Sequence, residues 1–167
     1  SMDRKIEEVE LAAGAIAYGL QANGIDTSII DTHNSRTTLA KPFGTEVEQF
    51  EKKIFAGRVS GGTPLTSTVQ FGRQRMQRGD GQIPFMIIVT DGHPKSRDDF
   101  KEQVKKANFP VLGLYLNNNR KTVEKQLKLY DAAVVAGRDD DVNNKLIHLI
   151  KQIMFWNYER EESRRPY

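Results

Sequence analysis

The chain has 167 residues, and its 25 basic and 22 acidic residues leave a net charge of +3. This length, with 38% apolar residues, suits one domain with a sizeable core, whereas two domains would each be thin. The mild and dispersed charge gives no electrostatic argument for nucleic-acid binding. Cysteine is absent, which excludes disulfides, thiolate nucleophiles and cysteine-ligated zinc.

Nothing in the sequence indicates a membrane protein. Its apolar stretches are shorter than the ~18 residues that a membrane span needs. The start is charged from Asp3 onward, so no secretory signal is visible there. We expect a cytoplasmic protein without membrane association, and the sequence leaves a signal further upstream open.

The first third of the chain predicts a helix, two strands and a short helix. Apolar residues at 6–20 recur at spacings of three and four, which predicts an amphipathic helix ending near Gly24. Two strands, 25–31 and 37–43, follow on either side of a polar turn. Pro42 in the second suits an edge strand, since proline cannot donate to a central ladder. The apolar face of the short helix comprises Val47, Phe50, Ile54 and Phe55.

The middle of the chain combines a glycine-rich loop with an uninterrupted apolar run. Thr63 before Pro64 is a common helix opening, in which threonine caps and proline occupies the first turn. From Ile83 to Val89 the residues are apolar without alternation, which is typical of a parallel strand buried on both faces. Asp91 therefore lies where this strand leaves the core.

The last part of the chain alternates helices with strands. Ser96 is predicted to cap a helix, and strands are predicted at 109–116 and 132–136 with another helix between them. The acids at 139–141 precede a final helix, where they favour the helix dipole, so we interpret them as capping and not as metal ligands. Residues 158–167 form a polar tail or linker. The apolar face of the final helix comprises Val142, Leu146, Ile150 and Ile153.

These alternating elements predict an α/β fold with three layers, a doubly wound, mostly parallel sheet and helices on both faces. Ligands of such sheets bind beyond the carboxyl ends of the strands. Two polar loops are expected there, Ser60–Leu65 (SGGTPL) and Thr90–Gly92 (TDG). Their hydroxyl and carboxylate oxygens are ligands that hard cations prefer. Because Mg²⁺ takes about six oxygens, a third loop is expected to contribute as well.

The motifs resemble those of the von Willebrand factor type A (VWA) domain. After a helix and a strand come K-x-F at 41–43, GGTPL at 61–65 and VTDGHP at 89–94. The resemblance implies a Rossmann-like VWA fold and a metal-ion-dependent adhesion site built from three loops. Those loops supply a D-x-S-x-S motif, a threonine and an aspartate. Thr63 matches the threonine and Asp91 matches the aspartate.

The first of these loops is where the sequence departs from the family. The D-x-S-x-S motif does not occur in the chain. In members of the family, a methionine and a lysine-bearing helix often follow the last serine of that motif, and Ser1 followed by Met2 matches this serine. An alternative of equal weight is that Ser1 remains from an expression tag. The family also places a first strand in the middle of its sheet. We therefore expect residues 1–157 to form a VWA-like domain that lacks this strand, and expect the natural protein to extend upstream or another segment to supply it.

The resemblance implies a protein-binding module without catalytic activity. A divalent cation, Mg²⁺ or Mn²⁺ with Ca²⁺ as a further option, would be held by Thr63, Asp91 and Ser1. An acidic side chain from a protein partner would complete its coordination. Intracellular relatives work in larger assemblies, such as chelatase complexes and partners of ring ATPases, and no nucleic acid is expected.

Two other interpretations remain open. V-T-D-G also resembles the nucleophilic aspartate of a Mg²⁺-dependent phosphohydrolase of the haloacid dehalogenase type, although His93 stands where those enzymes need a second acid. Alternatively, Thr63 is only a helix cap and Asp91 only a turn former. The histidines predict no zinc site because no pair has the required spacing, and His93 is expected to face solvent.

Overall fold

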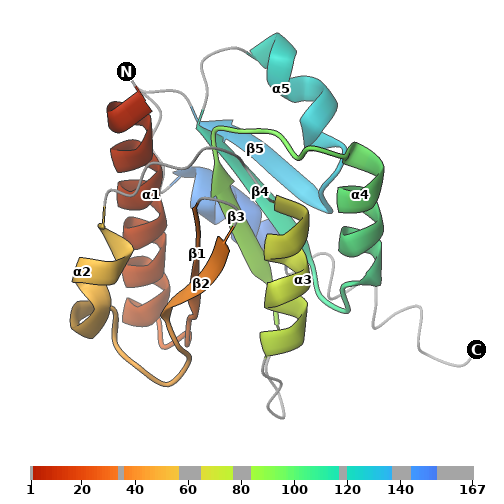
Figure 1. Ribbon diagram of the computed structural model, residues 1–167. Coiled ribbons are helices and arrows are strands. Elements are labelled where there is room, and N and C mark those ends of the chain that lie inside the picture. The colour runs from red at the N-terminus through yellow and green to blue at the C-terminus, as the bar shows by residue number, and fades with distance from the viewer. Residues whose placement is uncertain are drawn as a thin grey trace, which may run out of the picture.

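The computed structural model describes residues 2–33, 36–56, 65–76, 84–116, 120–136 and 144–153. Within them the chain is a mixed α/β protein in which a three-stranded parallel sheet is flanked by helices (Figure 1). The predicted acidic cap at 139–141 and the polar tail at 158–167 lie outside these residues. In chain order the elements are α1 (Met2–Ala22), β1 (Ile29–His33), β2 (Arg36–Lys41), η1 (Val47–Phe50), α2 (Glu51–Ile54), α3 (Leu65–Arg75), β3 (Met86–Thr90), α4 (Arg97–Lys106), β4 (Val111–Leu116), α5 (Arg120–Leu127), β5 (Ala132–Ala136) and a helix at 144–153.

The first helix ends as its sequence predicts. Gly24 has a φ of 74°, and its N–H donates to the carbonyl of Gln21 at 2.9 Å. The N–H of Ile25 donates to the carbonyl of Leu20 at 3.0 Å. A glycine in the left-handed conformation thus closes the helix and satisfies carbonyls of its last turn.

The first predicted strand is displaced along the chain. Strand β1 begins at Ile29 and pairs antiparallel with β2, with a register shift between Ile29 and Ile30. The residues before it are held by other contacts: the Ser28 hydroxyl donates to the Lys41 carbonyl at 2.9 Å, and Asp26 accepts from the N–H of Gly44 at 2.9 and 3.0 Å. These long-range bonds replace strand pairing there.

The parallel sheet has the order β3-β4-β5, with Thr90 opposite Tyr115 and Leu116 opposite Ala136. Alternate residues of β4 face opposite layers, since Val111 and Tyr115 belong to one apolar cluster and Leu112 and Leu114 to the other. The sheet is therefore covered by helices on both faces, as predicted. The first cluster also contains Leu65, Val69, Phe100 and Val104 from α3 and α4, and the second contains Ile16, Leu20, Leu146, Leu149 and Ile153 from α1 and the helix at 144–153.

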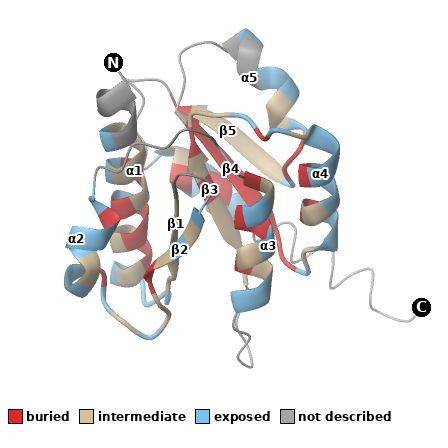
Figure 2. Ribbon diagram, in the orientation of Figure 1, coloured by how far each residue is buried: buried red, intermediate tan, exposed pale blue. Residues whose placement is uncertain are grey.

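The described strands form two sheets and not one. Strands β1 and β2 make a separate antiparallel pair, so the expectation of one mostly parallel sheet holds only for β3, β4 and β5. Strand β4 is buried from Val111 to Tyr115, whereas β3 is buried only at Ile88 and Thr90 (Figure 2). Whether a further strand lies between the two sheets stays a prediction.

Among the described helices, none combines the length and apolar character needed to cross a membrane.

Candidate functional site

Asp91 lies at the carboxyl-end edge of the parallel sheet. It follows directly on the last residue of β3, in a bend of the chain, and its side chain is half-buried. Thr90 before it is only 5% exposed, and its hydroxyl oxygen accepts from the N–H of Gly92 at 3.0 Å. This hydrogen bond folds the backbone back at the strand end, which leaves the carboxylate at the rim of the sheet and not in the core.

The loop after Asp91 is anchored to the neighbouring strand. The His93 ring stacks against that of Tyr115 with a centroid distance of 6.4 Å and an interplanar angle of 27°. His93 is exposed, as expected from the sequence, and Pro94 is buried. Because Tyr115 is a buried residue of β4, this contact ties the Asp91 loop to the core.

Tyr115 also contacts a second buried tyrosine, Tyr130. The hydroxyls of Tyr115 and Tyr130 are 3.2 Å apart, and their rings meet edge to face at 5.8 Å. Burial raises the pKa of both phenols, and the neighbouring phenol raises that of Tyr130 further. Both hydroxyls therefore stay protonated at neutral pH, which makes this pair a structural support and not a source of general bases.

Only one of the three predicted metal ligands falls in the described part of the chain. Thr63 and Ser1 lie outside it, so their placement relative to Asp91 stays a prediction. Within the described ranges, no group of three or more histidine, aspartate or glutamate side chains could hold a metal ion. Asp91 contributes one carboxylate, and a cation there would depend on oxygens from the other predicted loops.

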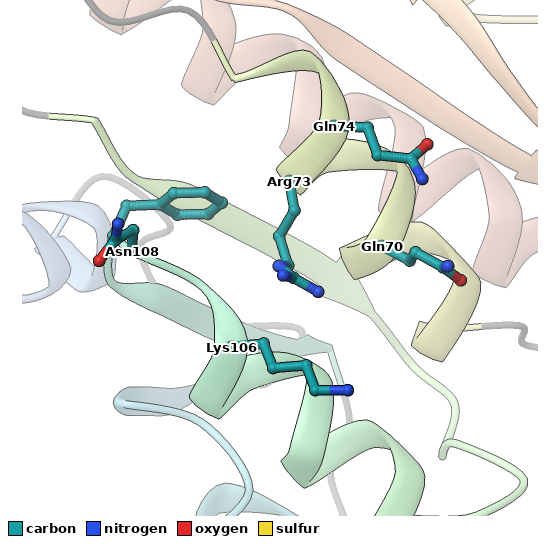
Figure 3. Close-up of a pocket in the computed structure, with 6 residues that line it drawn as sticks. Gln70, Arg73, Gln74, Lys106 and Asn108 are labelled. Atoms are coloured by element: carbon teal, nitrogen blue, oxygen red, sulfur yellow. The ribbon is translucent and has the colours of Figure 1, made fainter.

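A polar pocket of about 290 Å³ lies between α3 and α4. Arg73 extends from α3 toward α4 (Figure 3), where it donates to the Gln103 side chain at 2.7 Å. The pocket adjoins Phe109, just before β4 begins, so it lies at the amino ends of the parallel strands. Asp91 lies at the opposite edge, and the pocket is not part of the predicted site. Its lining comprises Gln70, Arg73, Gln74, Lys106, Asn108 and Phe109.

Sequence reasoning missed the burial of Lys41, the lysine of the K-x-F motif. Its side chain is fully buried, and its ammonium group donates to the carbonyl of Thr27 and, at 3.2 Å, to that of Pro42. Burial lowers the pKa of Lys41, and Asp26 partly opposes this effect. The available signal was the position of Lys41 between the apolar residues Ala40 and Pro42 at a strand end. A lysine buried there needs hydrogen-bonding partners, which the two carbonyl groups supply.

Comparison with known proteins does not identify the chain. No protein-family model matches it, and no curated protein does. The resemblance to VWA domains therefore rests on the motifs in the sequence.

Proposed function

We propose that the chain is a divalent-metal-dependent protein-binding module of the VWA type. One observation supports this most strongly: Asp91 of the VTDG motif lies in a bend directly after a parallel strand, half-buried at the carboxyl-end edge. Ligands of parallel α/β sheets bind at this edge. A carboxylate in this position is accessible to an ion and is fixed by the strand behind it.

The proposed site combines three oxygen ligands. The Asp91 carboxylate would bind the cation together with the hydroxyls of Thr63 and Ser1. Mg²⁺ and Mn²⁺ suit such a set, and Ca²⁺ accepts the same ligand types. A cation held by a single protein carboxylate keeps positive charge and open coordination positions, so an acidic side chain of a partner protein can complete its shell. We propose a partner within a larger cytoplasmic assembly, such as an ATPase or chelatase-like complex.

The phosphohydrolase alternative gains no support from the described residues. It also uses an aspartate after a strand, but it needs a second acid two residues later. His93 occupies that position, is exposed, and stacks on Tyr115. The resemblance to those enzymes therefore stops at the first aspartate, and we do not propose catalysis.

Isothermal titration with Mg²⁺ and with Mn²⁺ tests the site. The parent is expected to bind, and Asp91→Ala to bind at least about tenfold more weakly, because loss of one anionic ligand costs more than ~1.4 kcal/mol. Asp98→Asn is the matched control, since Asp98 is an exposed acid in the first turn of α4 and should leave the affinity unchanged. Equal affinity of Asp91→Ala and the parent would contradict the proposal.

A further inference from the structure

The polar pocket between α3 and α4 brings side chains of the two helices together. Gln70, Arg73 and Gln74 follow one another at spacings of three and four, so they lie on one face of α3. Lys106 is the last residue of α4. The charged ends of Arg73 and Lys106 extend to the same side of the pocket (Figure 3). The side-chain amides of Gln70 and Gln74 extend to this side as well.

Arg73 is held in place by a neutral partner. Its side chain is half-buried, and its guanidinium group donates to the side-chain oxygen of Gln103 at 2.7 Å. This bond uses one of the five N–H donors of the guanidinium group. Within the described ranges, no carboxylate forms an ion pair with Arg73. Because the arginine is partly removed from water, an anion that met it here would be attracted more strongly than in open solvent.

Lys106 has a carboxylate partner that it can leave. Its ammonium group lies 2.7 Å from the carboxylate of Glu102, one turn earlier in α4. The two side chains are 51% and 60% exposed. Ion pairs that are this exposed contribute little to stability. Lys106 can therefore turn from Glu102 to a ligand at small cost.

The surroundings of the pocket are basic on both helices. Each helix carries two basic residues in its last turn, namely Arg73, Arg75, Lys105 and Lys106. Basic residues at this position also complement the helix dipole. Each of them serves that role singly, so the dipole accounts for the charges but not for a cavity that is lined by one cation from each helix.

We propose that this pocket binds a phosphate monoester group. Such a group carries a charge of about −1.5 to −2 at neutral pH, which matches the two cations Arg73 and Lys106. The planar guanidinium group of Arg73 would bind two phosphate oxygens, and the ammonium group of Lys106 would act as a point charge. The amides of Gln70 and Gln74 would donate to the remaining oxygen. A carboxylate or a phosphodiester carries a single charge and would leave one cation unpaired.

The size of the pocket limits what it can enclose. Its volume of about 290 Å³ lies at the lower end of the range of ligand sites. Gln70, Gln74, Lys106 and Asn108 are exposed, so the phosphate group would be bound while the rest of the ligand stays outside. A phosphorylated protein side chain and a small phosphorylated molecule both offer this group. The proposed cation site at Asp91 lies at the opposite edge of the sheet, so this inference does not depend on it.

An amide NMR titration in EDTA and at low salt tests the inference. Four probes are compared: glycerol 2-phosphate, a short phosphoserine peptide, the same peptide without phosphate, and the diester dimethyl phosphate. Both monoesters should shift the signals of Arg73, Gln74 and Asn108 and leave that of Gly92 in place. The diester and the unphosphorylated peptide should bind at least about fivefold more weakly, because they lack the second charge or any charge on the ligand group. Tighter binding of the phosphopeptide than of glycerol 2-phosphate would assign the ligand to a protein partner, and equal binding would assign it to the phosphate group alone.

Two arginine variants separate the pocket from general charge. Arg73→Gln should weaken monoester binding at least about tenfold, because it removes charge-assisted hydrogen bonds. Arg75→Gln is the matched control: Arg75 lies in the same turn of α3, stacks on the Phe71 ring at 3.8 Å and does not line the pocket. It makes the same change in charge and should weaken binding by less than about threefold.

The α4 variants test the second cation. Lys106→Gln should weaken binding about threefold or more, and Lys105→Gln should have a smaller effect. Glu102→Gln should tighten binding about twofold, because it releases Lys106. Absence of any shift at Arg73 up to about 20 mM monoester would overturn the inference. Equal weakening by Arg73→Gln and Arg75→Gln would do so as well, and equal binding of dimethyl phosphate would overturn the assignment to a monoester.

Discussion

The substitution Gly113→Ala tests the packing of the Tyr130 ring on strand β4. Gly113 lies in β4, and a Cβ added to it would lie 3.1 Å from three ring atoms of Tyr130. Non-bonded carbon atoms prefer about 3.5–4.0 Å, so the ring or the strand must move by a few tenths of an ångström. The Tyr130 ring has little room to retreat, since Phe100 packs against it at 5.1 Å and Tyr115 at 5.8 Å, both edge to face.

The expected cost follows from two opposing effects. Overpacking a dense core destabilises by about 1–3 kcal/mol. Replacing a strand glycine by alanine recovers about 0.5–1 kcal/mol of chain entropy. The net loss for Gly113→Ala is therefore about 0–2.5 kcal/mol, which for a domain of this size lowers Tm by up to about 10 °C.

Thermal and urea denaturation measure this loss. Gly19→Ala in α1 is the matched control, because the added Cβ meets nothing within 4 Å apart from its chain neighbours and the backbone of its own helix. It should stabilise by about 0.5–1 kcal/mol. Tyr130→Leu removes the clash, so Gly113→Ala should cost less in that background. If Gly113→Ala raises Tm as much as Gly19→Ala does, the described packing around Tyr130 is wrong.

Two further predictions concern a helix cap and the buried phenols. The Ser96 hydroxyl accepts from the N–H of Asp99 at 3.2 Å, so Ser96→Ala should cost about 1 kcal/mol in urea denaturation while Ser96→Asp retains the acceptor; equal losses would argue against the cap. The pKa values of Tyr115 and Tyr130 are raised in the folded chain, so these two phenols ionise near pH 10 only in the unfolded chain. The free energy of unfolding should therefore fall as pH rises above about 10. Tyr115→Phe should make this decline shallower, and an unchanged slope between about pH 9 and 11 would contradict the assignment.

Local patterns predicted much of the fold. The end of α1 at Gly24, the Ser96 cap and strand β5 agree with the sequence, because each depends on neighbouring residues. The displacement of β1 was not predictable in this way. It depends on contacts of Asp26 with Gly44 and of Ser28 with Lys41, which periodicity does not reveal.

The division into two sheets and the tyrosine pair also depend on long-range contacts. Apolar runs predict strands but do not say which strands pair. Tyr130 lies beyond the end of α5 and packs on Gly113, which the helical pattern before it does not predict. A glycine inside a strand was the available signal, since it often marks close approach of another group. The position of Asp91 was predictable because it follows from the strand end alone.

The proposed metal site is tested most directly by paramagnetic broadening with Mn²⁺. In a titration followed by amide NMR, the signals of Gly92 and His93 should broaden first, because they adjoin Asp91. The signal of Asn108, beside the pocket at the opposite edge of the sheet, should persist. Asp91→Ala should abolish the broadening at Gly92 and His93. Broadening that spares these two residues, or that is the same in Asp91→Ala, would contradict a cation site at Asp91.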